Sequence, residues 1–141
     1  FNKFRTRIKM PNLISKNSSI SRYSKLGIAN FFNHFCFIGA NSIIGNNNII
    51  NTKSLIEHDV KIGSHCHIGP NVKIGGGSSV GDNVMCGIGS IIINKIKICS
   101  NVTIGAGTII TKNITKPGTY VTAGNKLRKL WYIYPLVVFK T

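Results

Sequence analysis

The chain has 141 residues, 43% of them hydrophobic and 15% charged, which fits one folded domain and excludes a disordered chain. Its 18 lysines and arginines against three acids give a net charge of +15, which favours phosphate-bearing or otherwise acidic partners. We find no RNA-binding, helix-turn-helix or zinc-finger pattern, and the longest apolar run, 130–139, is too short to span a bilayer. We therefore expect a soluble cytoplasmic protein with no nucleic-acid binding and no stable membrane insertion.

Three regions follow one another along the chain. Residues 1–13 are basic and aromatic, and Pro117-Gly118 marks a turn that opens a C-terminal cap or tail over 116–141. The tail could instead contact a membrane or another chain. Between them, within 14–115, an apolar residue recurs at every sixth position without a break: Ile14, Ile20, Leu26, Phe32, Ile38, Ile44, Ile50, Ile56, Ile62, Ile68, Ile74, Val80, Cys86, Ile92, Ile98, Ile104 and Ile110.

The period of six predicts the fold. Neither a helix, with 3.6 residues per turn, nor a strand, with alternation every second residue, produces it. A solenoid does: each hexad forms one flat side, and three hexads close a triangular coil of eighteen residues that pairs with the next coil through parallel ladders. Small or β-branched residues two positions before each repeat residue fill the corners, and glycine often follows it. The sequence thus predicts an all-β protein, a single-stranded parallel β-helix shaped as a triangular prism.

The four cysteines form no Cys-x-x-Cys pair, so zinc and redox motifs have no support. Cys36, Cys66 and Cys86 fall on inward positions, where we expect them to act as small buried hydrophobes. His65 and His67 flank Cys66 and should point outward. They lack a third ligand at a matching spacing, so we predict no metal site.

Two of the three acids flank one histidine, in Glu57-His58-Asp59. A neighbouring carboxylate holds an imidazole in one tautomer and raises its basicity, as a general base for acyl transfer requires. Residue 76 lies eighteen positions after His58, so Gly76 should stack above it in the next coil. Its N–H, unobstructed by a side chain, could donate to a developing oxyanion.

Segment 51–124 resembles the sialic-acid O-acetyltransferase and amino-sugar N-acetyltransferase family of hexapeptide-repeat acyltransferases. The resemblance rests on Ile56-Glu57-His58-Asp59, on Ser64-His65-Cys66-His67-Ile68-Gly69-Pro70, on Gly75-Gly76 and on Ile104-Gly105-Ala106-Gly107-Thr108. It implies a left-handed β-helix, a homotrimer, and direct acetyl transfer from acetyl-CoA to a sugar or nucleotide-sugar of surface glycan biosynthesis. The resemblance implies that His58 is the proton acceptor, that Asp59 adjusts its basicity, and that the Gly76 N–H binds the thioester carbonyl. It also implies that the coenzyme lies in a groove between two subunits, lined by His67, Ile88 and Ala106. Charge and location, rather than resemblance, suggest that Lys112, Lys126 or Arg128 meets the coenzyme phosphates.

The chain departs from the family pattern at both ends. Members usually carry a small Rossmann-like domain ahead of the β-helix, and residues 1–13 resemble only a remnant of the junction to it. The apolar tail is also unfamiliar. Two other readings stay open: an acyltransferase that takes its acyl group from acyl carrier protein, and a non-catalytic binding solenoid or inactive fragment.

Overall fold

The computed structural model describes residues 10–123 and 126–130, which form nineteen β-strands in three sheets. Sheet A contains β1 (Leu13–Ile14), β4 (Phe31–Phe32), β7 (Ile49–Ile50), β10 (His67–Ile68), β13 (Met85–Cys86), β16 (Val102–Ile104), β18 (Gly118–Ala123) and β19 (Lys126–Leu130). Sheet B contains β2 (Ser19–Ile20), β5 (Phe37–Ile38), β8 (Leu55–Ile56), β11 (Lys73–Ile74), β14 (Ile91–Ile92) and β17 (Ile109–Ile110). Sheet C contains β3 (Lys25–Leu26), β6 (Ile43–Ile44), β9 (Lys61–Ile62), β12 (Ser79–Val80) and β15 (Lys97–Ile98).

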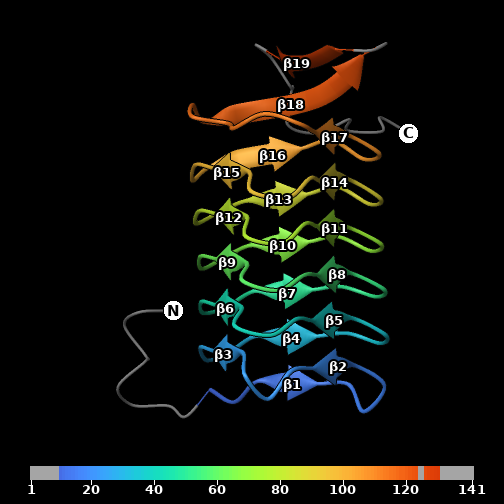
Figure 1. The fold of residues 1–141 in the computed structure, drawn as a ribbon, viewed down its shortest axis with the longest axis vertical. Helices are drawn as coiled ribbons and strands as arrows, with labels where there is room; N and C mark the ends of the chain where they lie inside the picture. The colour runs from blue at the N-terminus through green and yellow to red at the C-terminus, as the bar shows by residue number, and fades with distance from the viewer. Residues whose placement is uncertain (1–9, 124–125, 131–141) are drawn as a thin grey trace, which may run out of the picture.

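The chain visits the three sheets in rotation, so that successive strands belong to A, B and C in turn (Figure 1). Paired residues in the parallel ladders are eighteen positions apart, as in His67 with Met85 and Ile74 with Ile92. The predicted eighteen-residue, three-sided coil is therefore confirmed. Residues that differ by eighteen lie directly above one another along the prism.

The repeat residues fill the axis of the prism in most coils. Fourteen of the seventeen are buried, from Phe32 to Ile110. The first three are not: Ile14 is 51% exposed, and Ile20 and Leu26 are half-buried. The periodicity alone predicted them inside, but no coil among the described residues lies below them to cover their side chains.

The corners are tight turns whose third residue after the repeat residue has a positive φ. Eleven non-glycine residues take this conformation, among them Asn41 (59°), Asp59 (59°) and Lys95 (59°). Such backbone is disfavoured for residues with a β-carbon, and asparagine and aspartate tolerate it best. The glycines one position after the repeat residue have a different cause: a β-carbon on Gly75 would lie 2.5 Å from the Asn94 nitrogen of the next coil.

The period ends with a shortened coil and a hairpin. Ile114 bridges to Ile98, and Ile104 pairs with Tyr120, so partners here are sixteen residues apart instead of eighteen. Strand β18 then turns back into antiparallel β19 and covers the end of the prism (Figure 1). Tyr120 and Leu127 pack against the core. Residues 1–9 of the predicted junction and 131–141 of the predicted tail lie outside the described residues.

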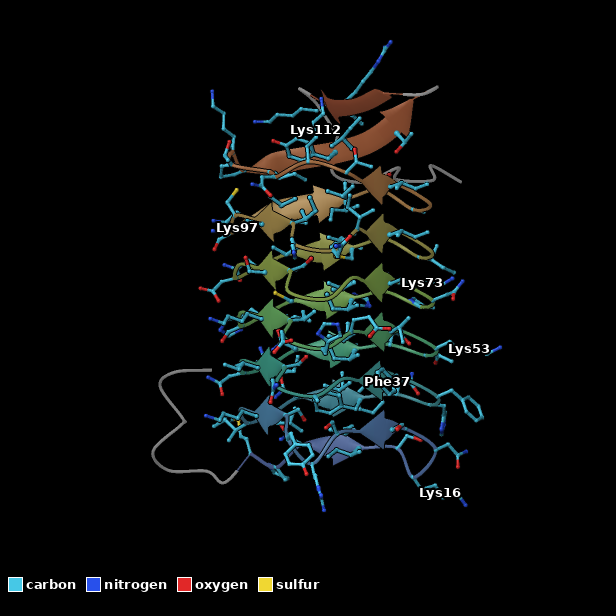
Figure 2. All side chains as sticks on the ribbon, in the orientation of Figure 1. Lys16, Phe37, Lys53, Lys73, Lys97 and Lys112 are labelled. Atoms are coloured by element: carbon cyan, nitrogen blue, oxygen red, sulfur yellow. The ribbon has the colours of Figure 1, made fainter. Side chains whose placement is uncertain are left out.

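The three outer faces differ in character. Sheets A and B expose apolar side chains, including Phe31, Ile49 and Met85 on A, and Phe37 and Ile109 on B. Sheet C exposes lysines at every second coil, Lys25, Lys61 and Lys97, together with Ile43, and sheet B also exposes Lys73 (Lys73 and Lys97 are labelled in Figure 2). No helix in the described part of the chain is long and apolar enough to cross a membrane.

Candidate active site

The side chains of His58 and Asp59 are hydrogen-bonded to each other on a corner of the prism. They lie in the turn that follows β8, where sheet B gives way to sheet C, and we call this edge the B–C corner. His58 Nδ1 lies 2.7 Å from Asp59 Oδ2, and the two side chains are 65% and 54% exposed. Since an ionised carboxylate can only accept, Nδ1 carries the proton. In the neutral imidazole, Nε2 is then the nitrogen that can accept a proton.

Gly76 lies directly above His58 in the next coil, as the repeat arithmetic predicts. A β-carbon at Gly76 would lie only 2.8 Å from His58 Nε2, so the imidazole occupies the space that a side chain at Gly76 would fill. In the part of the chain that the structure describes, the Gly76 N–H has no hydrogen-bond partner. The corner therefore combines a base and an available amide donor within reach of one small reacting group.

Backbone and side-chain hydrogen bonds from the coils on either side hold the turn that carries the pair. Asp59 N–H donates to the Ala40 carbonyl (2.9 Å), and Gly77 N–H donates to the His58 carbonyl (3.0 Å). The buried Ser42 hydroxyl donates to the Glu57 carbonyl (2.7 Å) and accepts from Val60 N–H (3.2 Å). Sequence reasoning assigned Ser42 only to a core corner; its spacing, eighteen residues before Val60, is the signal that could have identified it.

The electrostatics of the pair follow from these contacts. The hydrogen bond from His58 lowers the pKa of the Asp59 carboxyl below its ordinary value, and a bond from Asn41 in the coil below acts in the same direction. Desolvation opposes both. Asp59 therefore stays ionised well into the acid range and keeps accepting the Nδ1 proton.

Three of the four predicted coenzyme-binding residues lie away from the B–C corner that carries His58. Ile88 and Ala106 stack on the corner between sheets A and B, which we call the A–B corner, where Gly107 N–H donates to the Ile88 carbonyl (2.8 Å). Ile88 is 59% exposed. His67 lies on the outer face of sheet A, near Asn51. Only Lys112 shares the B–C corner with His58, three coils further along.

The cysteines behave as the repeat predicts. Cys36, Cys66 and Cys86 are buried and Cys99 is partly buried, all as free thiols. Burial raises the pKa of Cys36 and of Cys66 to about 11, and that of Cys86 to about 12. No group of three His, Cys, Asp or Glu side chains among the described residues could hold a metal ion.

The chain is similar to one protein family and to several known proteins. Residues 41–76 match the family of bacterial transferase hexapeptide repeats. The β-helix superimposes with a TM-score of 0.85 on GDP-perosamine N-acetyltransferase from Caulobacter crescentus, solved with CoA and GDP-perosamine, at 27% identity over 90% of this chain and 61% of that one. The acetyltransferase domain of PglB from Neisseria gonorrhoeae, solved with acetyl coenzyme A, gives 0.84 at 25% identity over 92% of this chain and 62% of that one.

A curated relative, UDP-3-O-acylglucosamine N-acyltransferase of Bordetella avium, is 36% identical over 80 residues, which is 57% of this chain and 22% of the relative. The chain thus spans about three-fifths of the two structures and about a fifth of the curated relative. Its own coil length, its matched repeats and these superpositions agree on one architecture. The chain carries hexapeptide repeats and has the left-handed parallel β-helix fold of these acetyltransferases.

Proposed function

We propose that the chain is the catalytic β-helix of an acyltransferase that moves an acetyl group from acetyl-CoA to a sugar or nucleotide-sugar, with His58 as general base. One observation carries the proposal: a carboxylate-oriented imidazole that occupies the space beside a glycine with an unpaired N–H. The names of the similar proteins support the reaction class, because all three are acyl- or acetyltransferases and two of the names specify a sugar acceptor, perosamine or glucosamine.

The chemistry follows from the positions of three groups. The amine or hydroxyl of the acceptor attacks the thioester carbonyl carbon while His58 Nε2 removes its proton. The carbonyl oxygen becomes an oxyanion and accepts a hydrogen bond from Gly76 N–H. Asp59 stabilises the imidazolium that forms. When the C–S bond breaks, the coenzyme thiolate leaves and takes the proton from His58, so the enzyme is restored without a covalent intermediate.

The donor groove requires a second copy of the chain. His58, Gly76 and Lys112 occupy the B–C corner, whereas Ile88 and Ala106 occupy the A–B corner of the same prism. One rigid prism cannot place both corners against a single ligand, but adjoining protomers of a closed ring can. The apolar outer faces of sheets A and B provide surface for such an association, and the lysines of sheet C disfavour contact between two C faces. We propose the homotrimer on these grounds.

The name of the Bordetella relative specifies acyl rather than acetyl transfer, which supports acyl carrier protein as a second candidate for the donor. A donor series separates the two candidates. Acetyl-CoA and longer acyl thioesters of coenzyme A and of acyl carrier protein are each offered with a nucleotide-linked amino sugar, and thioester consumption is measured. We expect acetyl-CoA to be consumed fastest; consumption of the carrier-protein thioesters alone would replace our donor assignment.

His58→Ala tests the general base. Loss of a positioned base costs about 10²- to 10⁴-fold in rate. The matched control is His34→Ala, because His34 is also exposed and hydrogen-bonded, with Nδ1 2.6 Å from Ser15 Oγ. We expect His34→Ala to keep its rate and both variants to keep the wild-type oligomer in sedimentation. Equal rates for wild type and His58→Ala would rule out the mechanism.

A further inference from the structure

The B–C corner carries a row of backbone N–H groups that the protein itself leaves unpaired. Residues eighteen positions apart stack along this corner, because Ile20 pairs with Ile38 and Ile38 with Ile56. At the turn position of His58, four successive N–H groups have no hydrogen-bond partner among the described residues: those of Ala40, His58, Gly76 and Asn94. The row therefore continues for one coil below His58 and two coils above it.

The equivalent row at the corner between sheets C and A is closed by side chains. There each N–H donates to a side-chain oxygen of the residue eighteen positions later: Ile28 to Asn46 (2.9 Å), Asn46 to Ser64 (3.0 Å), Ser64 to Asp82 (2.6 Å) and Asp82 to Ser100 (2.9 Å). The repeat can thus satisfy these groups from within the chain, and on the B–C corner it does not. The unpaired N–H groups there are available to the oxygen atoms of a ligand.

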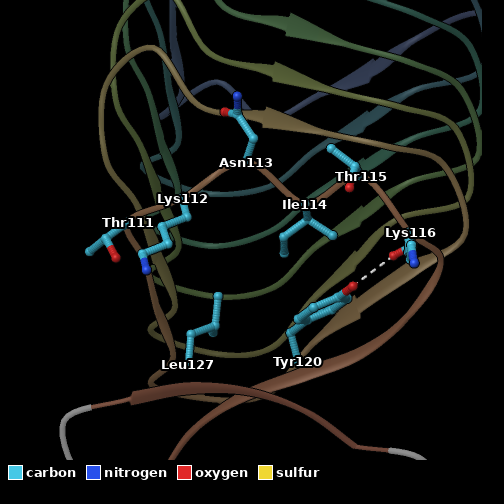
Figure 3. Close-up of a pocket in the computed structure, with 8 residues that line it drawn as sticks. All are labelled: Thr111, Lys112, Asn113, Ile114, Thr115, Lys116, Tyr120 and Leu127. Carbon is cyan, nitrogen blue, oxygen red and sulfur yellow. Dashed lines mark hydrogen bonds between the residues drawn. The ribbon is translucent and has the colours of Figure 1, made fainter.

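A cation lies at each end of the B–C row. Lys112, the candidate for the coenzyme phosphates, lies at the upper end and lines a cavity of about 480 Å³ between the last coil and the hairpin (Figure 3). Arg22 lies at the lower end, two coils below His58, or about 10 Å at the spacing of hydrogen-bonded strands. Ala40, between Arg22 and His58, has only a methyl group and fills little of the space between them.

Arg22 is exposed, but the next residue orients its guanidinium. Arg22 Nη2 donates to the Tyr23 hydroxyl (2.6 Å), and the guanidinium carbon lies 4.8 Å from the centroid of the Tyr23 ring. No acid of the chain pairs with it, since Glu57 and Asp59 lie two coils higher and Asp82 lies higher still. The remaining guanidinium N–H groups can therefore bind an oxyanion of a ligand, and phosphate suits their fork geometry.

The direction of the proposed reaction assigns this lower end to the acceptor. With the donor extended from Gly76 toward Lys112, the amine or hydroxyl of the acceptor reaches the thioester carbon from the side of His58 that faces Arg22. A sugar whose nucleophile lies at His58 then spans Ala40, and the substituent on its anomeric oxygen lies beside Arg22. In an activated sugar this substituent is a phosphate, whether it belongs to a nucleotide or to a lipid carrier.

We propose that Arg22, oriented by Tyr23, binds the phosphate on the anomeric oxygen of the sugar acceptor, an inference that rests on the proposed function. In this arrangement the Ala40 N–H donates to an oxygen of the sugar ring. The protein then selects a glycosyl phosphate over the free sugar. Affinity for the acceptor depends on Arg22, whereas the rate of transfer depends on His58.

Calorimetric titration of the full chain tests the site, with coenzyme A in excess to occupy the donor groove. The ligands are GDP-perosamine, perosamine 1-phosphate and free perosamine, which share one sugar and differ in the phosphate and the nucleotide. The test variant is Arg22→Gln. The control is Lys16→Gln, which removes an exposed cation from the A–B corner of the same coil (Lys16 is labelled in Figure 2). Both residues are exposed, so thermal denaturation should show both variants folded.

We expect the wild type to bind both phosphorylated ligands about tenfold more tightly than free perosamine, the contribution of a charge-assisted bond. Arg22→Gln should lose this preference and bind free perosamine as the wild type does. Lys16→Gln should bind all three ligands like the wild type. In turnover, Arg22→Gln should raise the KM for the phosphorylated acceptor and change kcat little.

Three results overturn the inference: a wild type without the phosphate preference, an Arg22→Gln variant that keeps it, or an equal loss in Lys16→Gln. A preference confined to GDP-perosamine also overturns it, because recognition would then belong to the base. A failure of the proposed function would appear separately, since binding is measured without turnover and only the rate of His58→Ala reports on the general base.

Discussion

Replacing Gly76 by alanine tests the contact between the base and the coil above it. The new β-carbon would lie 2.8 Å from His58 Nε2 and 2.9 Å from Cε1, closer than real β-carbons approach other atoms. The imidazole must move, because it is the exposed end of a side chain while the glycine backbone is fixed by its coil. Movement breaks the 2.7 Å contact with Asp59 and covers the Gly76 N–H.

Gly76→Ala should change stability little and the rate of acyl transfer strongly. Gly76 does not have a positive φ, so alanine fits its backbone, and a surface substitution of this kind changes the free energy of unfolding by about 0.5 kcal/mol or less. The rate should fall by about 10²- to 10³-fold, the cost of a misplaced base or a blocked oxyanion donor.

Gly77→Ala is the matched control, because it should lower stability and leave the rate of transfer unchanged. Gly77 has a φ of 69° and open space around its added β-carbon, whose nearest neighbour is a Lys95 side-chain carbon at 3.6 Å. Alanine there should lower stability by about 1 kcal/mol through backbone strain while leaving His58 in place. Thermal denaturation and thiol release from acetyl-CoA are measured for both variants. A fully active Gly76→Ala, or a Gly77→Ala as impaired as Gly76→Ala, would refute the assigned contact.

Three further predictions concern the site and the core. Asp59→Asn should slow turnover throughout the pH range, since a neutral amide stabilises the imidazolium poorly; a rate profile that matches wild type would remove Asp59 from the mechanism. Ser42→Ala should cost about 1–3 kcal/mol of unfolding free energy, because the Glu57 carbonyl and the Val60 N–H lose their buried partner; denaturant titration measures it, with the exposed Ser19→Ala as the comparison. Thiol labelling at pH 8 should modify Cys99 first, since with a pKa of about 11 only about one in a thousand Cys36 or Cys66 thiols is ionised, and labelling of those two should rise as pH approaches 11. Rapid labelling of all four thiols in the native protein would contradict their buried placement.

Much of the site was predictable because coil length is a sequence property. Once the period is six and the coil has three sides, residue 76 must lie above residue 58, and the structure places Gly76 against His58 accordingly. The inward or outward direction of each side chain follows from the same count, as with Cys66 inside and His65 outside. For Ser42 the count gives the position, eighteen residues before Val60, but not the hydrogen bonds, because serine at an inward corner need not bond to the turn that carries His58.

The sequence by itself determined the coil, its core and the position of the histidine–aspartate pair on an edge, because each depends only on local periodicity and on stacking at a fixed interval. Only the tertiary structure decided how the chain folds after Ile110, where the six-residue repeat ends. There the distance along the chain between paired residues falls from eighteen to sixteen, at Ile114 and Tyr120. Together with the hairpin that follows, this leaves a cavity between the last coil and the hairpin.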